Sequence, residues 1–262
     1  MTAEVETFAL VPGGECYIKS WTPPDFDFPE PIVLLHDSLG CVGLWREFPA
    51  KLAARTGRTV VAYDRLGFGK SSPRTEIPSP RFIREEAEIY FPYIRDALGI
   101  DQFALFGYSV GGGMAIHIAA QPRSRCVALI TESAQAYLEE LTLKTIRAAQ
   151  QQFRDPEQLA RLERWHGEKA SWVLQAWTEV WQLPEVRDWT LQDVLPEVTC
   201  PTLAIHGDRD DFGSFEFPRM IAELVSGPSE MVLLNDCGHM PHREHEEEVL
   251  EAIDGFLCRA FV

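Results

Sequence analysis

Short apolar runs alternate with segments in which apolar residues recur every three or four positions. The runs lack internal alternation, which is typical of strands buried on both faces of a parallel sheet, and they fall at 31–35, 59–63, 103–106, 127–130, 202–205 and 231–234. The periodic segments between them fit helices that cover such a sheet. The pattern therefore predicts an α/β fold with a doubly wound, mostly parallel β-sheet flanked by helices, and active residues at the carboxyl ends of the strands.

Two local patterns depart from this alternation of strand and helix. Residues 4–21 alternate between apolar and polar around Pro12-Gly13-Gly14, which predicts a β-hairpin. Pro92 interrupts the helical pattern of residues 87–98. Because proline lacks an amide hydrogen, we expect that helix to be kinked or irregular there.

The alternation stops between residues 134 and 190, where the pattern is helical throughout. We therefore expect an α/β core formed by residues 1–133 and 191–262, with residues 134–190 inserted as a helical cap. Next to the carboxyl ends of the strands, such a cap would form an apolar lid and would modestly favour a substrate with a bulky or apolar group. Five of the seven tryptophans lie in or at the end of the insertion: Trp165, Trp172, Trp177, Trp181 and Trp189.

The composition argues against nucleic acids, membranes and metals as binding partners. The formal net charge is −16, and an acidic chain is repelled by nucleic acids and by anionic membrane surfaces. The six cysteines are scattered singly, without the spacing of metal ligands, so we expect reduced thiols and no metal site. The N-terminal residues lack a basic segment followed by an apolar run, and no run approaches 18 apolar residues. We therefore expect a cytoplasmic protein with no membrane partner.

The candidate chemistry begins at Gly107-Tyr108-Ser109-Val110-Gly111, directly after an apolar run. A serine flanked at two residues' distance by glycines predicts a strand that enters a tight turn and then a helix. Ser109 would take a strained backbone conformation there, and side chains at 107 and 111 would collide across the turn. An ordinary glycine-rich turn is the alternative interpretation of this motif alone.

A serine hydroxyl is a poor nucleophile at neutral pH, so Ser109 needs a base beside it and a group that orients that base. Asp210 follows one predicted strand, and His239 follows the next. Both would lie on the same edge of the sheet as Ser109. The order Ser, Asp, His along the chain is the one expected for this architecture.

These segments, together with His36-Asp37-Ser38-Leu39-Gly40 and the stretch from Asp64 to Ser71, resemble the α/β-hydrolase fold superfamily over nearly the whole chain. The resemblance implies a serine hydrolase with Ser109 as nucleophile, His239 as general base and then acid, and Asp210 as orienting carboxylate. It also implies an oxyanion hole formed by the backbone N–H groups of Ser38 and Val110. The family usually has glycine where this chain has Asp37, which places a carboxylate near a site that must stabilise negative charge.

Other residues compete for some of these roles. Asp208 and Asp211 flank Asp210, and Glu132 follows a predicted strand where some members of this fold hold their acid. Five other histidines are not expected to act as the base. His206 has no partner in the pattern, His36 and His117 are expected to be structural, and His242 and His245 are expected to face solvent.

The predicted function is hydrolysis of a small carboxylic ester or thioester through an acyl-enzyme on Ser109, with no cofactor and no metal. A carbon–carbon bond hydrolase or a lactonase with the same three residues is the alternative. A non-catalytic ligand receptor on this fold is a more distant one. The expected partner is a small acyl compound, and the pattern does not indicate an oligomeric state.

Overall fold

The computed structural model describes residues 2–25 and 28–261, and its centre is one eight-stranded sheet. The strand order is β1-β2-β4-β3-β5-β6-β7-β8, in which β1 and β2 run antiparallel to their neighbours and the other strands are parallel. This confirms the predicted doubly wound α/β fold. The strands are β1 (Ala3–Val11), β2 (Gly14–Thr22), β3 (Phe28–Leu35), β4 (Arg58–Tyr63), β5 (Phe103–Tyr108), β6 (Cys126–Glu132), β7 (Thr202–Gly207) and β8 (Ser229–Leu234).

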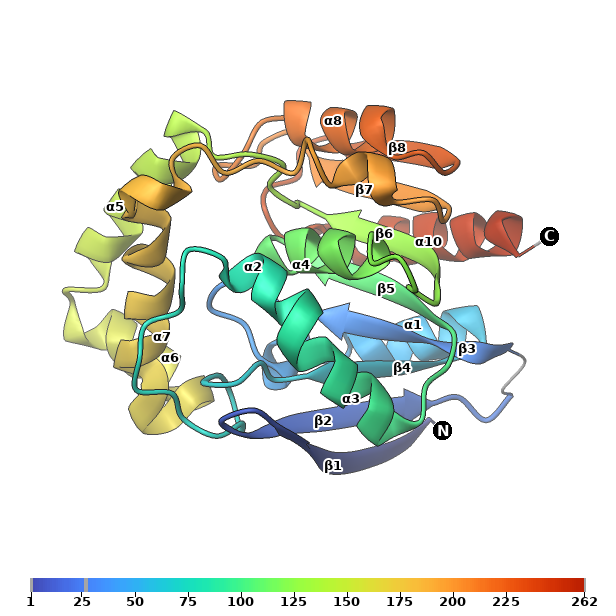
Figure 1. The fold of residues 1–262 in the computed structure, drawn as a ribbon, viewed down its shortest axis with the longest axis horizontal. Coiled ribbons are helices and arrows are strands. Elements are labelled where there is room, and N and C mark those ends of the chain that lie inside the picture. Colours follow the sequence, from blue (N-terminus) through green and yellow to red (C-terminus); the bar gives the residue numbers. More distant parts are fainter. Residues whose placement is uncertain (1, 26–27, 262) are drawn as a thin grey trace.

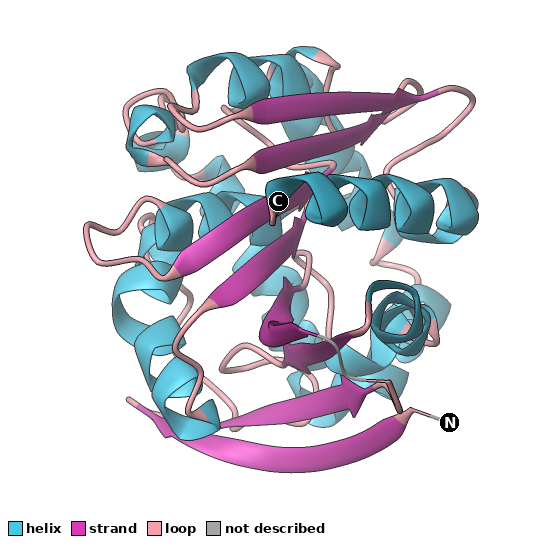
Figure 2. Ribbon diagram, turned by 90° about the vertical axis from the view of Figure 1, so that its right-hand side faces the viewer, coloured by secondary structure: helices cyan, strands magenta, loops and turns pink. Residues whose placement is uncertain are grey.

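Helices cover both faces of the sheet (Figure 1, Figure 2). They are α1 (Phe48–Thr56), α2 (Phe82–Glu85), α3 (Phe91–Leu98), α4 (Val110–Ala119), α5 (Glu140–Gln152), α6 (Pro156–His166), α7 (Ala170–Thr178), α8 (Glu216–Leu224), α9 (Pro241–Glu244) and α10 (Glu246–Ala260). The shorter turns are η1 (Val42–Trp45), η3 (Gly167–Lys169), η4 (Val180–Gln182), η5 (Pro184–Val186) and η6 (Leu195–Glu197), which are 3-10, and η2 (Glu86–Tyr90), which is π-helical.

Strand β3 shows why the apolar runs do not alternate. Ile32 and Leu34 pack in the layer formed with α1 and α10, whereas Val33 and Leu35 pack in the layer formed with α3, α4 and α8. Figure 1 shows α3 and α4 in front of the sheet and α1 and α10 behind it. Since successive side chains point to opposite faces and both faces are buried, every position of the strand must be apolar.

The helical stretch that contains Pro92 is irregular. The π-helical turn η2 leads directly into α3, and Pro92 lies in the first turn of that helix. Because proline carries no amide hydrogen, it cannot donate to the carbonyl four residues earlier. The helix accommodates this with a wider, π-helical turn that contains one extra residue.

All of residues 134–190 are described, and none belongs to the sheet. They carry α5, α6 and α7, which lie beyond the carboxyl ends of the parallel strands, at the left of Figure 1. An isolated bridge pairs Tyr137 with Thr190, so the two ends of the segment lie side by side. Within residues 2–25 and 28–261, no helix is both long and apolar enough to cross a membrane.

The half-buried imidazole of His117 in α4 makes a testable contribution to stability. Burial lowers its pKa from 6.5 to about 4. Between these values the unfolded chain binds a proton that the folded protein does not, so this contribution is present above pH 6.5 and is lost as the pH falls toward 4. Relative to a His117→Gln variant, the wild type should lose about 2 kcal/mol between pH 7.5 and 4.5.

Urea unfolding at the two pH values measures this difference. The control is His245→Gln, because Glu248 raises the pKa of that partly exposed histidine, so its contribution to stability should be lost as the pH rises rather than as it falls. Equal pH dependence of the wild type and the His117→Gln variant would contradict the assignment.

Candidate active site

Ser109 occupies the tight turn between β5 and α4, with φ 55° and ψ −125°. The two flanking glycines are required by close backbone contacts. A Cβ atom on Gly107 would lie 2.4 Å from the carbonyl oxygen of Gly111, and one on Gly111 would lie 2.2 Å from the carbonyl oxygen of Leu35. The turn therefore has no room for a side chain at either flanking position, as the motif predicts. It holds the Ser109 side chain at the carboxyl end of the sheet.

The structure brings Ser109, His239 and Asp210 together from the loops after β5, β8 and β7. The Nε2 atom of His239 lies 3.0 Å from Ser109 Oγ, and its Nδ1 atom lies 2.9 Å and 2.8 Å from the two carboxylate oxygens of Asp210. Ser109 is 5% exposed and Asp210 is 9% exposed. A neutral imidazole that donates from Nδ1 to the carboxylate leaves Nε2 free to accept the serine proton.

Asp210 has further neighbours that fix its orientation. Its Oδ1 atom accepts the Phe212 N–H at 2.7 Å, and its Oδ2 atom lies 3.3 Å from His206 Nε2. Burial lowers the pKa of His206, so this ring is neutral at pH 7. The sequence indicated no partner for His206. A spacing of four residues between a strand and the loop after it, as between His206 and Asp210, does not predict that two side chains meet.

The other candidate acids do not contact His239. Asp208 Oδ1 accepts the Cys237 N–H at 3.3 Å, and the Asp211 carbonyl oxygen accepts the Thr145 hydroxyl at 2.7 Å. The Glu132 carboxylate lies in a separate buried pair with His242, at 2.5 Å.

The expectation that His242 faces solvent is therefore wrong. Its side chain is 2% exposed and that of Glu132 is 0% exposed. The His242 ring packs against Trp45, Phe48 and Tyr108, with ring centroids 4.9 to 5.4 Å apart. These contacts arise because α9 folds back toward the end of β6, which no local pattern predicts. His245, by contrast, is partly exposed and pairs with Glu248.

The two expected oxyanion donors lie in segments next to Ser109. Val110 begins α4, so its N–H has no acceptor within that helix. Ser38 lies in the loop after β3, the strand that pairs with β5, and it lines the same hollow as Ser109.

The loop that contains Ser38 is held by His36. The His36 Nδ1 atom lies 2.8 Å from the Asp37 carbonyl oxygen, and Nε2 accepts the Arg65 N–H at 3.1 Å. Burial, reinforced by the Arg65 guanidinium, lowers the pKa of His36 well below 6.5, which keeps the ring neutral. The unusual Asp37 fits the turn, since its carboxylate accepts the Leu39 N–H at 3.4 Å and its carbonyl accepts the Gly40 N–H.

A hollow of about 190 Å³ opens over Ser109. Its apolar wall includes Ile146 from α5, Trp177 from α7 and Trp181 from η4, so two of the five tryptophans of residues 134–190 reach it. Gln135 also lines it, with Nε2 at 3.4 Å from Ser109 Oγ. Sequence reasoning missed Gln135, because a single glutamine three residues beyond a strand matches no motif.

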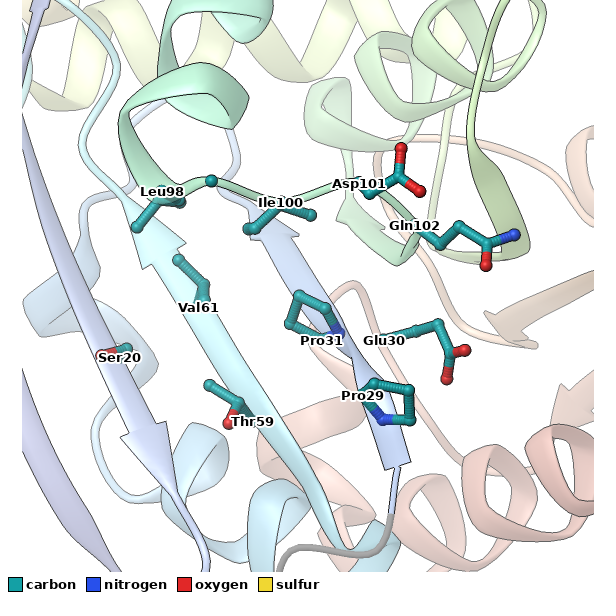
Figure 3. A pocket seen from close by; sticks show the side chains of 11 residues that line it. Ser20, Pro29, Glu30, Pro31, Thr59, Val61, Leu98, Ile100, Asp101 and Gln102 are labelled. Carbon is teal, nitrogen blue, oxygen red and sulfur yellow. The ribbon is translucent and has the colours of Figure 1, made fainter.

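A larger hollow, of about 510 Å³, lies at the opposite edge of the sheet. Figure 3 shows its lining from the beginnings of β3 and β4 and from residues 98–102, which lead into β5. Active residues in such sheets lie at the carboxyl ends of the strands. The smaller hollow at that edge, which contains Ser109 and His239, is therefore the candidate active site.

Comparisons with known proteins agree with this architecture. Residues 30–246 match the family model of the alpha/beta hydrolase fold. A proline iminopeptidase of Lactobacillus helveticus is 25% identical, over 87% of this chain and 89% of its own length. The serine hydrolase BPHL of Mus musculus is 26% identical, over 76% of this chain and 69% of its own length. A solved esterase from Exiguobacterium antarcticum superposes with a TM-score of 0.75 at 20% identity and covers 96% of this chain and 99% of its own.

Proposed function

Because the chain belongs to the α/β-hydrolase fold family, we propose that it is a serine hydrolase that cleaves a small carboxylic ester or thioester. The observation that carries the proposal is the continuous hydrogen-bonded series from Ser109 Oγ through the His239 ring to the Asp210 carboxylate, within a pocket at the carboxyl edge of the sheet. Each of the three groups has the chemistry that acyl transfer needs.

In this mechanism Ser109 Oγ attacks the carbonyl carbon while His239 Nε2 accepts the serine proton. The Asp210 carboxylate stabilises the resulting imidazolium and keeps Nδ1 protonated. His239 then donates its proton to the leaving alcohol or thiol, and the acyl group remains on Ser109. A water molecule, deprotonated by the same Nε2 atom, hydrolyses the acyl-enzyme.

The backbone N–H groups of Ser38 and Val110 would stabilise the oxyanion of the tetrahedral intermediate. Such donors are effective because they are already oriented before charge develops. The position of Val110 at the start of α4 supports its part, since the partial positive charge of a helix N-terminus favours an anion.

We further propose that residues 134–190 act as a cap that shapes the acyl site. Ile146, Trp177 and Trp181 from this segment, together with Phe212, form an apolar wall of the pocket. A hydrocarbon group on the substrate would bury apolar area there at about 25 cal/mol per Å². A compact acyl group fits a hollow of this volume better than a long chain.

Bonds other than esters and thioesters are also candidates for cleavage. The relative named proline iminopeptidase favours a peptide bond as a second candidate. The same three residues would also serve a carbon–carbon bond hydrolase or a lactonase. Among the described residues that line the pocket there is no Lys or Arg, so a substrate with a free carboxylate would lack a counter-charge there. A panel of p-nitrophenyl esters, acyl thioesters, aminoacyl anilides, lactones and ring-cleavage products would separate these activities.

The test of the proposal is labelling by a fluorophosphonate, with intact-mass measurement. The wild-type protein should gain one adduct, mapped by peptide analysis to Ser109, and the Ser109→Ala variant should gain none. Absence of an adduct on the folded wild type, or equal labelling of the variant, would rule out an activated serine at this position.

A further inference from the structure

Gln135 lies beside the proposed nucleophile, and its hydrogen-bonding capacity is largely unused. We propose that it selects acyl groups that carry a hydrogen-bond donor, an ammonium or a hydroxyl, on the carbon next to the carbonyl. The expected substrates are therefore α-amino and α-hydroxy acyl esters or amides. This inference rests on the proposed serine hydrolase function and specifies its substrate class.

The first observation is the state of the Gln135 amide. The residue is 6% exposed, lines the pocket and donates from Nε2 to Ser109 Oγ over 3.4 Å, which is a long hydrogen bond. Its Oε1 atom is buried and has no partner among the described residues. A buried amide oxygen without a partner is costly. A ligand group that reaches this amide would relieve that cost.

The second observation concerns which groups of the pocket can contact each part of the bound substrate. In the tetrahedral intermediate, the carbonyl carbon bonds to Ser109 Oγ, to the oxyanion, to the leaving group and to the acyl chain. The N–H groups of Ser38 and Val110 are assigned to the oxyanion, and the His239 Nε2 atom is assigned to the leaving group. Gln135 also lines the pocket and has no role in these assignments, and its Nε2 atom lies 3.4 Å from Oγ, so we assign it to the α-substituent of the acyl chain.

The amide can meet either kind of substituent, because its two ends exchange on rotation by 180°. With Oε1 toward the pocket it accepts from an ammonium or a hydroxyl, and with Nε2 toward the pocket it donates to a hydroxyl oxygen. A substrate without a polar α-substituent would leave one end of the amide without a partner. Sites that contain buried polar groups discriminate strongly against analogues that cannot pair with them.

The charge of the pocket favours the ammonium. The described lining contains Asp37 and no Lys or Arg, and the Arg65 guanidinium, which donates to the Asp37 carbonyl oxygen at 2.8 Å, is buried outside that lining. A cation on the substrate would therefore be attracted, and an anion would be repelled.

Three benzyl esters of one carbon skeleton test the inference: those of leucine, of 2-hydroxy-4-methylpentanoic acid and of 4-methylpentanoic acid. They differ only in the α-substituent, so ratios of kcat/KM isolate its recognition. For the wild type, we expect the leucine and hydroxy esters to exceed the unsubstituted ester by about tenfold or more, as for one lost hydrogen bond in a buried site.

The Gln135→Met variant keeps the side-chain length and removes both polar ends. It should lower both ratios about tenfold or more, with Gln135→Leu as a second variant. Asp37→Asn should lower the ratio of the leucine ester to the hydroxy ester. The matched control is Ser133→Ala, which removes a buried hydroxyl without a described partner two residues away and outside the pocket lining, and it should leave the wild-type ratios unchanged.

Equal turnover of the three esters by the wild type overturns the inference. So does an equal loss on all three in the Gln135 variants, which would place Gln135 at the oxyanion or in the scaffold. Fluorophosphonate labelling without turnover of the leucine ester also overturns it, while the serine hydrolase function stands. Absence of both labelling and turnover removes the proposed function itself, so the two failures are distinguishable.

Discussion

Replacement of Asp210 with asparagine is expected to lower kcat about 10,000-fold. The carboxylate accepts from His239 Nδ1 with both oxygens, and its Oδ1 atom also accepts the Phe212 N–H. In the variant, the amide oxygen would remain with Phe212, and the amide NH₂ would then point at His239. The ring would have to accept at Nδ1 and carry its proton on Nε2. In that tautomer it cannot take the proton of Ser109.

Steady-state hydrolysis of an ester substrate measures this effect, with circular dichroism as the check on folding. The matched control is Asp208→Asn, two residues away, because Asp208 contacts the Cys237 N–H and not His239. Its kcat should stay within about threefold of the wild type, as for a surface change outside the site. Retention of a tenth or more of the wild-type kcat by the Asp210→Asn variant would show that another group orients His239.

Replacement of Glu132 with leucine is expected to destabilise the folded protein by about 3 to 5 kcal/mol. The carboxylate is fully buried and lies 2.5 Å from His242 Nδ1. Without it, the His242 ring keeps a buried polar atom among three aromatic side chains. A loss of this size is typical when one partner of a buried pair is removed, because the remaining group is left unsatisfied.

Urea unfolding of the single and double variants measures this pair. The double variant Glu132→Leu/His242→Phe replaces both groups with apolar ones and should regain at least half of the loss. The surface pair of His245 and Glu248 provides the control, and Glu248→Leu should destabilise the protein far less than Glu132→Leu, because solvent screens that pair. A Glu132→Leu variant within 1 kcal/mol of the wild type would show that the buried pair contributes little.

The pair of Glu132 and His242 also bears on the position of His239. The Tyr108 ring packs against both His239 and His242, with centroids 5.4 Å and 4.9 Å apart. The segment between the two histidines is thus anchored at a buried point three residues beyond His239. Comparison of kcat between the double variant and the wild type would measure how much this buried pair contributes to the position of His239.

Much of the fold followed from the sequence alone, because its determinants are local. Apolar runs such as 31–35 indicated strands buried on both faces, and the glycines around Ser109 indicated a turn that only glycine permits. The irregularity near Pro92 likewise depends on the conformation of a few neighbouring residues. The order of Ser109, Asp210 and His239 indicated the site because parallel strands end at one edge of the sheet.

Contacts between distant segments depended on the tertiary structure. Glu132 and His242 are 110 residues apart, and only the packing of α9 against the end of β6 made them partners rather than an alternative acid and a surface histidine. Gln135 gained its position beside Ser109 in the same way. The sequence determined which elements form and which edge of the sheet carries the chemistry, because these follow from local periodicity and turn geometry. The tertiary structure decided which polar side chains meet there, because that depends on how the segments pack around the sheet.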